Sequence, residues 1–450
     1  MNAIGMPLMP NHYRQYLVKI LLVGTLLAGG SARASIEINY WLWDQSQLPI
    51  YRACADAFEK ENPEIKINIT QVDWADYWLA LNKAFVFGTG PDVITNNLAR
   101  FPELIQYNRL EDMEPLIVRD KVATNIYLPG LLKVWGRAGK QYGLPKDWGT
   151  VVIAYNKAML ETAGVDPNSL ANLTWNPTDG GTFGHLIAQL SVDANGRNGL
   201  DPGFDSHSLK QYGLLIRGQP DGFGVVEWIQ LAVSNGFKFY DGPWAQRFHY
   251  DDPRLAETIQ WLADMELKKR FVIPSRNAVL TGASELLAAQ KGALALIGSG
   301  DMISCVEKCK FAIGFAPLPQ GPVGPKSMLL YGNSDSIWVG TKHLEEAWKW
   351  VKFLASPDGQ KIVAGFGVVF PAIPEAAEIA KEAIGRKGID VSYYFKEASD
   401  TNPAFLVPVT DRARELLRIT DAAFAAILMN GEDAAKALKA ANDKVNALFD

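Results

Sequence analysis

Tryptophans, carboxylates and amides stand where short apolar runs of this sequence end. Asp44 and Gln45 follow the run that closes at Trp43, and Asn96 follows a short run that starts at Asp92. Indole rings stack on the apolar faces of sugar rings, while carboxylates and amides form hydrogen bonds with hydroxyls. Each of these polar residues alone is more often a turn residue or a helix cap. Their shared position at the ends of runs predicts a site for a polyhydroxylated ligand.

The candidate ligand-binding residues lie at expected strand ends, at chain crossings and in one loop rich in glycine and proline. We predict that at least two of four tryptophans stack on the ligand, Trp244 and Trp43 first, although a core position is the commoner use of tryptophan. Asp147 is the preferred hydrogen-bond acceptor, and its alternative role is to cap the segment after it. The candidate set is Trp43, Asp44, Gln45, Trp74, Asn96, Asp147, Trp148, Trp244, Gly298, Ser299, Asp301, Gly332 and Asn333.

The elements that must position these residues alternate between strands and helices. This order predicts an α/β fold with a mostly parallel sheet covered by helices on both faces, in which ligands bind beyond the carboxyl ends of the strands. The last fifty residues are expected to form two helices with a break at Asn430-Gly431. Strands are expected at 36–43, 65–72, 92–95, 142–144, 151–155 and 293–297, and helices at 49–61, 76–87, 101–107, 255–269 and 284–290.

Length and charge narrow the classes of function. A chain of 450 residues with 48% hydrophobic residues is long enough for two or three domains. The 44 basic residues are outnumbered by 49 acidic ones, so no basic excess favours nucleic acid or anionic lipid as a partner.

The first 34 residues are typical of an export signal. Arg14 and Lys19 precede an apolar run at 20–27, and Ala32-Arg33-Ala34 provides a small-x-small cleavage pattern. The apolar run is too short to span a bilayer, and no cysteine at its end could carry a lipid. We therefore expect cleavage after Ala34 and a soluble, periplasmic protein without a lipid anchor.

Cysteine usage is sparse, with Cys54, Cys305 and Cys309 only. Cβ atoms four residues apart on a regular helix lie about 5–6 Å apart, which is wider than a disulfide accepts. The pair Cys305 and Cys309 is a candidate disulfide if the helix frays before Lys310. Because the five histidines are scattered, we expect no metal site, and no motif calls for a cofactor.

Five motifs in order resemble the extracellular solute-binding proteins of the maltose-binding type, the sugar-capturing subunits of ABC importers. The resemblance runs over nearly the whole chain after residue 34. The motifs are Gly88–Val93, Gly139–Pro145 followed by Tyr155-Asn156-Lys157, Lys291–Gly298, Phe315–Pro319 and Ala347–Pro357.

This resemblance implies a type II periplasmic-binding-protein fold, a monomer of two lobes that close on the ligand about a hinge. Three crossings would lie near 145–151, 331–337 and 394–400. Lobe 1 would comprise 35–147 plus 335–395, and lobe 2 would comprise 148–334 plus 396–450. The implied function is capture of a di- or oligosaccharide for the permease subunits of an ABC importer, without catalysis.

The sequence departs from the family pattern in one place that bears on the ligand. Family members often carry a tryptophan shortly after the glycine that matches Gly298, where this chain has Ser299-Gly300-Asp301-Met302. Two alternatives therefore stay open. The same fold could bind a glycerophosphodiester through Lys146, or a polyamine through Asp44, Asp147 and Asp301. An exported glycoside hydrolase could use two of those carboxylates as an acid–base pair.

Overall fold

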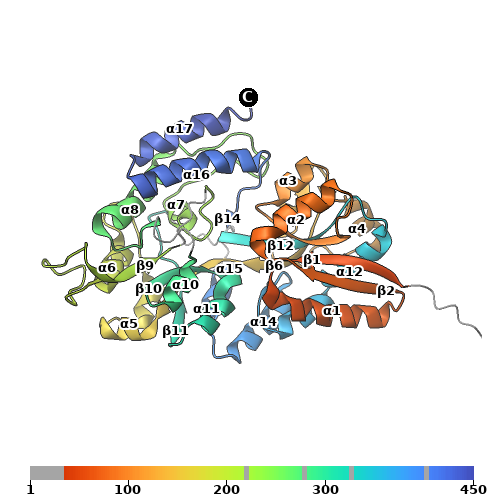
Figure 1. Ribbon diagram of the computed structural model, residues 1–450, viewed down its shortest axis with the longest axis horizontal. Helices are drawn as coiled ribbons and strands as arrows, with labels where there is room; N and C mark the ends of the chain where they lie inside the picture. Colours follow the sequence, from red (N-terminus) through yellow and green to blue (C-terminus); the bar gives the residue numbers. More distant parts are fainter. Residues whose placement is uncertain (1–34, 217–221, 276–280, 324–328, 400–404) are drawn as a thin grey trace, which may run out of the picture.

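The computed structural model describes residues 35–216, 222–275, 281–323, 329–399 and 405–450, which form two lobes (Figure 1). The expected export signal lies outside these residues. Each lobe has a β-sheet with helices on both faces, so the predicted two-lobed α/β class is confirmed. None of the helices in the described ranges is long and apolar enough to cross a membrane.

The first lobe is built on the larger sheet, in which the strand order is β13-β6-β12-β3-β1-β2 and β14 pairs with β12. Its strands are β1 (Ile36–Leu42), β2 (Ile65–Gln71), β3 (Val93–Asn97), β6 (Leu144–Gly149), β12 (Leu329–Ile337), β13 (Phe370–Pro371) and β14 (Phe405–Leu406). The accompanying helices are α1 (Leu48–Glu61), α2 (Trp74–Val86), α3 (Phe101–Gln106), α4 (Glu114–Asp120), α12 (Leu344–Leu354), α13 (Pro357–Gly365) and α14 (Pro374–Gly385), with a hairpin of β4 (Gly136–Arg137) and β5 (Lys140–Gln141).

The second lobe is built on a sheet with the order β11-β7-β10-β9-β8. Its strands are β7 (Val151–Asn156), β8 (Val192–Asp193), β9 (Leu209–Leu215), β10 (Gly292–Gly298) and β11 (Ile313–Ala316). Its helices are α5 (Lys157–Thr162), α6 (Gly181–Leu190), α7 (Ile229–Ser234), α8 (Pro253–Ala263), α10 (Ala283–Ala288), α11 (Met302–Lys308), α16 (Ala413–Asn430) and α17 (Ala434–Asn446). Helix α15 (Ser392–Ser399) lies between the lobes (Figure 1).

Strand pairing within the sheets differs from the prediction of mostly parallel strands. β1 pairs in parallel with β2 and β3, but β12 runs antiparallel to β3 and β6. In the second lobe β10 is parallel to β9 and antiparallel to β7. β6 passes through Thr150 directly into β7, which belongs to the other sheet, and β12 later returns to the first sheet against the direction of β6. Residues 145–149, expected to separate two strands, are themselves part of β6.

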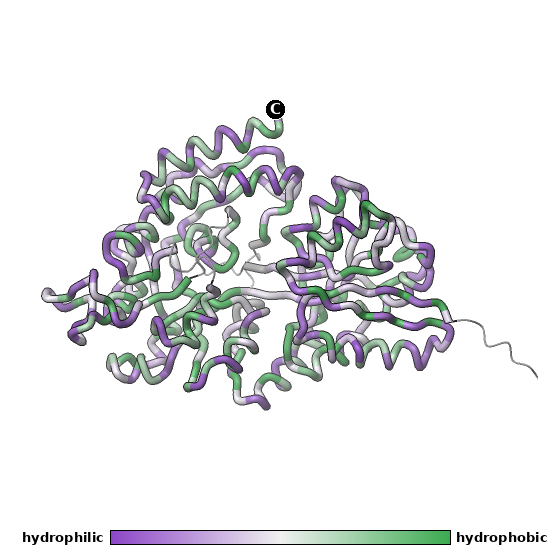
Figure 2. Tube along the Cα trace, viewed as in Figure 1, coloured by the Kyte–Doolittle hydropathy of each residue, from purple (hydrophilic) through white to green (hydrophobic). Residues whose placement is uncertain are grey.

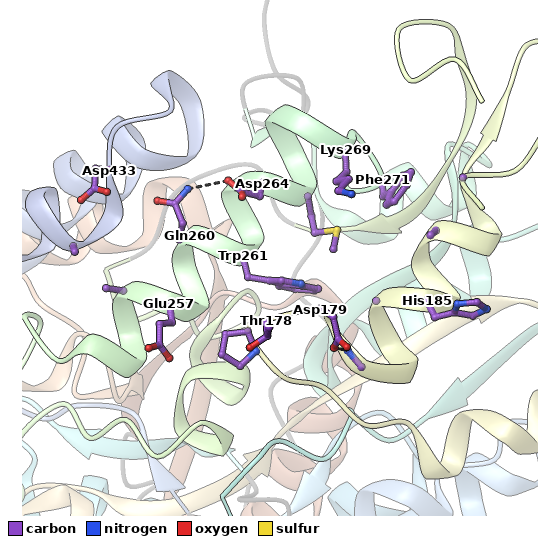
Figure 3. Close-up of a pocket in the computed structure, with 18 of the residues that line it drawn as sticks. Thr178, Asp179, His185, Glu257, Gln260, Trp261, Asp264, Lys269, Phe271 and Asp433 are labelled. Atoms are coloured by element: carbon purple, nitrogen blue, oxygen red, sulfur yellow. Dashed lines mark hydrogen bonds between the residues drawn. The ribbon is translucent and has the colours of Figure 1, made fainter. Parts of the chain in front are cut away.

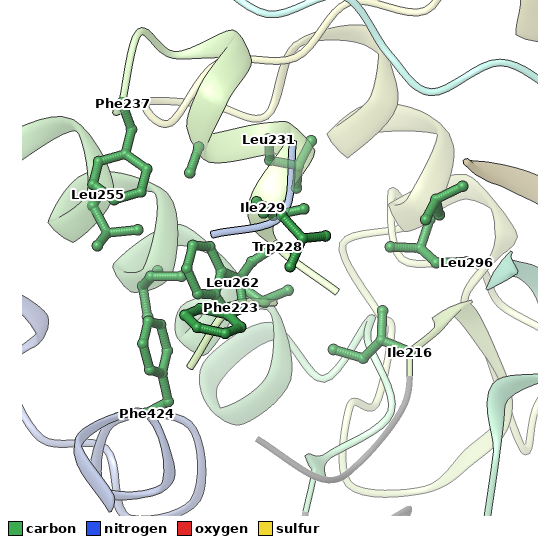
Figure 4. Packing of buried hydrophobic residues seen from close by; sticks show 14 of the residues in the cluster. Ile216, Phe223, Trp228, Ile229, Leu231, Phe237, Leu255, Leu262, Leu296 and Phe424 are labelled. Atoms are coloured by element: carbon green, nitrogen blue, oxygen red, sulfur yellow. The ribbon is translucent and has the colours of Figure 1, made fainter. Parts of the chain in front are cut away.

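The cores follow from alternation along the central strands. Val151, Ile153 and Tyr155 of β7 face one hydrophobic cluster, while Val152 and Ala154 face another, because successive side chains of a strand point to opposite faces. The outer helices alternate between hydrophilic and hydrophobic residues along their length (Figure 2). In the second lobe Trp228 stacks on Phe424 of α16 with ring centroids 4.6 Å apart, which fastens the C-terminal helices to that lobe (Figure 4).

The predicted break between the last two helices is confirmed. Helix α16 ends at Asn430, and Gly431 after it adopts a left-handed backbone conformation with φ 74°. Glycine is the usual residue there because it has no Cβ to clash. Helix α17 then begins behind Asp433, whose side chain accepts a hydrogen bond from the backbone N–H of Lys436.

Candidate functional site

A cluster of aromatic rings stands at the end of β1 and the start of α2. Trp43 contacts Trp74, Tyr77 and Trp78, with ring centroids 5.1, 5.3 and 5.8 Å away. Trp74 and Trp78 share one face of α2 because they are four residues apart. Trp74 keeps 45% of its surface exposed. The cluster therefore offers indole surface to a ligand, and it contains two of the predicted stacking residues.

A cavity of about 610 Å³ borders this cluster, a volume typical of small-molecule sites. Trp74 and Trp78 form part of its wall, together with Tyr107 after α3. Arg414 from α16 also lines it and pairs with Glu103 of α3 at 2.7 Å. Both lobes thus contribute to this cavity, which we call the interlobe groove. Its lining is Trp74, Ala75, Trp78, Leu79, Asn82, Val86, Arg100, Glu103, Tyr107, Arg109 and Arg414.

Asp147 and Asn333 join the two strands that lead from one lobe to the other. The Asp147 carboxylate on β6 accepts hydrogen bonds from the backbone N–H of Asn333 at 2.9 Å and from its Nδ2 at 3.0 Å. Asn333 in turn accepts one from Asn97 Nδ2 at 3.1 Å. Burial raises the pKa of Asp147, and nearby Lys146 partly offsets this. The structure thus gives Asp147 protein donors, and its role toward a ligand stays a prediction.

Lys146 points to the opposite face of β6 from Asp147. Its Nζ donates to the hydroxyls of Tyr40 and Thr95, both at 2.7 Å, and lies 3.8 Å from the carboxylate of Asp335. The side chain is almost completely buried, and burial lowers its pKa. The one cation proposed above for a phosphate is therefore enclosed in the first lobe.

Several other predicted residues have structural roles in this arrangement. Trp148 is 4% exposed and packs on Phe370, because alternation along β6 turns it toward the core, and its role toward a ligand stays a prediction. Asn96 is fully buried and donates to Ser336 Oγ at 3.2 Å. A Cβ on Gly332 would lie 2.4 Å from the carbonyl oxygen of Asp147, so glycine permits the close approach of β12 to β6.

Two predicted residues lie in the turn after β1. Asp44 caps the short 3₁₀ helix Gln45–Gln47, accepting from the backbone N–H of Ser46 at 2.9 Å and from Gln47 Nε2 at 2.8 Å. Gln45 is exposed beside it. The common capping role is thus present at Asp44, next to the aromatic cluster that begins at Trp43.

The predicted residues after β10 lie beside the crossing between β6 and β7. Ser299 N–H donates to the carbonyl of Thr150 at 2.9 Å, and Ser299 Oγ accepts from Thr150 N–H at 3.3 Å. A Cβ on Gly298 would lie 2.7 Å from the hydroxyl of Tyr331. Asp301 is exposed at the start of α11. These contacts attach the second lobe's sheet to the crossing.

Trp244 contacts the first lobe rather than lying open in its loop. Its Nε1 donates to the carbonyl of Gly136 at 3.2 Å, and the Arg137 guanidinium lies 4.4 Å from the centre of its ring. Arg137 also forms a bidentate pair with Asp411, with one bond of 2.6 Å. One face of this indole is therefore covered by Arg137, and its role as a stacking residue stays a prediction.

The candidate disulfide is not formed. Cys54, Cys305 and Cys309 are free thiols. Helix α11 stays regular through Lys308, and Cys309 N–H still bonds the carbonyl of Cys305 at 3.1 Å. Cys309 itself has an extended backbone conformation, so the helix ends there as expected, and the two thiols lie close enough to interact while their sulfurs remain unbridged. Within the described residues, no group of histidine, cysteine and carboxylate side chains could hold a metal ion.

A larger cavity, of about 1030 Å³, lies between α6 and α8 in the second lobe (Figure 3). Trp261 and Phe271 form its apolar wall. Two of its acidic lining residues have partners within the lobe: Asp264 accepts from Gln260 and pairs with Lys268, and Asp179 accepts from Gly181 N–H. All its lining residues belong to one lobe and none is a predicted site residue, so we place the candidate site at the interlobe groove.

The sequence matches the bacterial extracellular solute-binding proteins over residues 44–361, more than half of the chain. The chain belongs to this family. It is 28% identical to an arabinooligosaccharide-binding protein of Bacillus subtilis over 370 residues, 77% of each chain.

Solved structures of the family share the fold. An ABC substrate-binding protein from Listeria monocytogenes in complex with cycloalternan superimposes with a TM-score of 0.76 at 20% identity, over 92% of this chain and 99% of that one. UgpB from Mycobacterium tuberculosis in complex with glycerophosphocholine gives 0.72 at 16% identity, over 92% and 98%. At these identities the likeness establishes the two-lobed fold of a solute-binding protein.

Residues missed in the sequence analysis complete the groove of this solute-binding protein. Trp78 carried a usable signal, since it follows Trp74 at helical spacing. Arg100 and Arg109 lie on either side of α3, and Arg414 lies about 300 residues further on. No local pattern indicates that these three arginines meet.

Proposed function

We propose that this solute-binding protein captures a di- or oligosaccharide in the interlobe groove and delivers it to the permease of an ABC importer. The observation that carries the proposal is the aromatic cluster of Trp43, Trp74, Tyr77 and Trp78 beside a cavity that both lobes line. Aromatic faces with nearby polar groups suit sugar rings. The carbohydrates in the names of the Bacillus and Listeria relatives support the same ligand class.

We infer that ligand binding closes the lobes about β6 and β12. The lobe boundaries expected at 147/148 and 334/335 fall inside β6 and β12, so the bending residues lie beside these paired strands. A ligand that contacts both lobes shifts the equilibrium toward the closed state. Solution scattering should give a smaller radius of gyration with the cognate sugar; an unchanged radius at saturation would contradict closure.

Export fits this role, with cleavage after Ala34 and action as a soluble monomer outside the cytoplasm. N-terminal sequencing of the exported protein should begin at Ser35. Recovery of the chain with Met1 would contradict cleavage.

Substitution of Trp74 tests the ligand site. Calorimetric titration with arabino-, malto- and galacto-oligosaccharides identifies a ligand, and Trp74→Ala should then weaken its binding by about tenfold or more, roughly 1.4 kcal/mol. Melting should change little because Trp74 is partly exposed. Phe366→Ala is the matched control, since Phe366 is 38% exposed and does not line the groove. Equal affinity of Trp74→Ala and wild type would place the sugar elsewhere.

A further inference from the structure

The interlobe groove carries an excess of positive charge that the protein as a whole does not have. Three guanidinium groups line it, those of Arg100, Arg109 and Arg414, against the single carboxylate of Glu103. The whole chain, by contrast, has a formal net charge of −5. A local reversal of sign in a concave site concentrates ligands of opposite charge.

The backbone around two of these arginines is fixed by hydrogen bonds. Arg109 N–H donates to the carbonyl of Leu104 at 2.8 Å, and Arg109 accepts from Val339 N–H at 3.1 Å. Arg100 N–H donates to the carbonyl of Asn97 at 2.9 Å. The guanidinium groups therefore extend from anchored positions, which lowers the entropy lost when they bind a ligand.

The arginines lie beside aromatic surface rather than apart from it. The Arg100 guanidinium is 5.9 Å from the ring centre of Trp78. Trp78 Nε1 is buried and has no hydrogen-bond partner, and Trp78 lines the groove. The indole can stack on a sugar ring, while the planar guanidinium beside it can donate paired hydrogen bonds to an anionic substituent of that ring.

The arginines of the lining differ in the contacts that they already make, and Arg100 has an interaction of its own besides its position over Trp78. Glu103 pairs with Arg414 at 2.7 Å, while Arg109 has no ion-pair partner among the described residues. Arg109 is therefore the cation whose charge is least compensated within the groove.

We propose that the carbohydrate bound in this groove carries an anionic group, held by Arg109 with Arg100 and Arg414 around it. The inference rests on the proposed carbohydrate function and adds the charge of the ligand. Its chemistry is a carboxylate or phosphate on a sugar, and guanidinium groups bind either through paired hydrogen bonds.

Matched pairs of sugars provide the test. Calorimetry compares trigalacturonate with its carboxyl-reduced neutral counterpart, and glucose 6-phosphate with glucose, so that the two arms separate a carboxylate from a phosphate. We expect at least one acidic probe to bind about tenfold or more tightly than its neutral partner, with an affinity that falls as salt rises.

Arginine variants locate the effect. Arg109→Gln should weaken binding of the acidic probe by a larger factor than binding of the neutral sugar, and so remove most of the preference. Arg418→Gln is the matched control, because Arg418 is exposed one turn beyond Arg414 on α16 and does not line the groove. A neutral probe that binds as tightly as its acidic partner, or an Arg109→Gln variant that weakens both equally, overturns the inference while carbohydrate capture stands. Failure of every sugar in this set and in the neutral panel overturns both.

Discussion

Charged contacts between β6 and β12, the strands proposed as the hinge, differ in burial from those at the outer contact between the lobes. At the hinge, Lys146 and Asp147 of β6 face Asp335 and Asn333 of β12, and the charged groups are almost fully buried. At the outer contact, Arg137 pairs with Asp411 and Glu103 pairs with Arg414, and these side chains keep between 16% and 64% of their surface exposed. Both places connect distant parts of the chain through ion pairs or charge-assisted hydrogen bonds.

The difference in burial determines which of the two contacts can break at low energetic cost. A buried charge that loses its partner costs several kcal/mol, so the hinge strands keep their register. An exposed ion pair is worth about 0–1 kcal/mol, so the outer contact can open in water at little cost. We infer that the outer contact adds little to the free energy of the proposed closure.

The largest effect is expected at the hinge. Lys146→Met leaves the Asp335 carboxylate buried without its cation, although burial already raises the pKa of Asp335. We expect the free energy of unfolding to fall by about 3–5 kcal/mol in urea. Lys66→Met is the control, because Lys66 pairs with Glu59 on the surface and should change stability by less than about 1 kcal/mol. Equal losses of unfolding free energy in the two variants would show that the buried and the exposed ion pairs contribute alike.

A buried carboxylate in the second lobe provides a further contrast with the exposed ion pairs of the outer contact. Glu266 is fully buried and accepts hydrogen bonds from Ser275 N–H and Oγ at 3.0 and 3.1 Å. Burial raises its pKa to about 7. The folded protein thus holds a proton that the unfolded chain releases above about pH 4.5, so this contribution to stability is present at low pH and is lost as pH rises through 7.

Glu266→Gln should remove that pH dependence. Between pH 5 and pH 8 the wild type should lose about 2–3 kcal/mol of stability relative to the variant, measured by urea unfolding at several pH values. Glu257→Gln, at an exposed position of α8, should follow the wild type. Parallel pH curves for wild type and Glu266→Gln would show that the carboxyl titrates at its ordinary value.

Much of the fold could be predicted because its signals are local. The expected helix at 49–61 and strand at 65–72 agree with α1 and β2 to within a residue, and Asn430-Gly431 marked the last break. The direction of strand pairing could not be predicted from alternation. The direction depends on the path of the whole chain, which enters the second sheet with β7 after Thr150 and returns to the first sheet with β12 at Leu329.

The positions of candidate residues were predictable where the ends of strands determine them. Trp43 and Trp74 were expected from the rule for strand ends and do lie together. Trp148 and Trp244 have the same residue type, but their neighbours come from Phe370 and Arg137, far away in the sequence. Whether an indole is open or covered depends on such distant contacts, and composition carries no signal for them.

At the outer contact, substitution of Arg137 should weaken sugar binding more than loss of the ion pair that Arg414 forms with Glu103. Trp244 holds a left-handed backbone conformation, φ 65°, which is costly for a bulky residue and is supported here by its bonds to Val409 and Gly136. Arg137→Ala removes the pair with Asp411 and the cation over Trp244. We expect a larger radius of gyration without ligand and about threefold to tenfold weaker sugar binding. Arg386→Ala, an exposed arginine after α14, should change neither, and compaction equal to wild type in Arg137→Ala would exclude a role in closure.

The smallest effect is expected for the pair of Glu103 with Arg414, since Arg414 is the most exposed partner at this contact. Glu103→Gln removes the charge and keeps the shape, so affinity for a neutral sugar should fall by less than about fivefold, or roughly 1 kcal/mol. Titrations at rising salt give the sharper measurement. At about 1 M salt the screening length is near 3 Å, so wild type and variant should converge there. A difference that persists at high salt, or exceeds that of Arg137→Ala, would mean that Glu103 acts through packing in the groove rather than through an exposed ion pair.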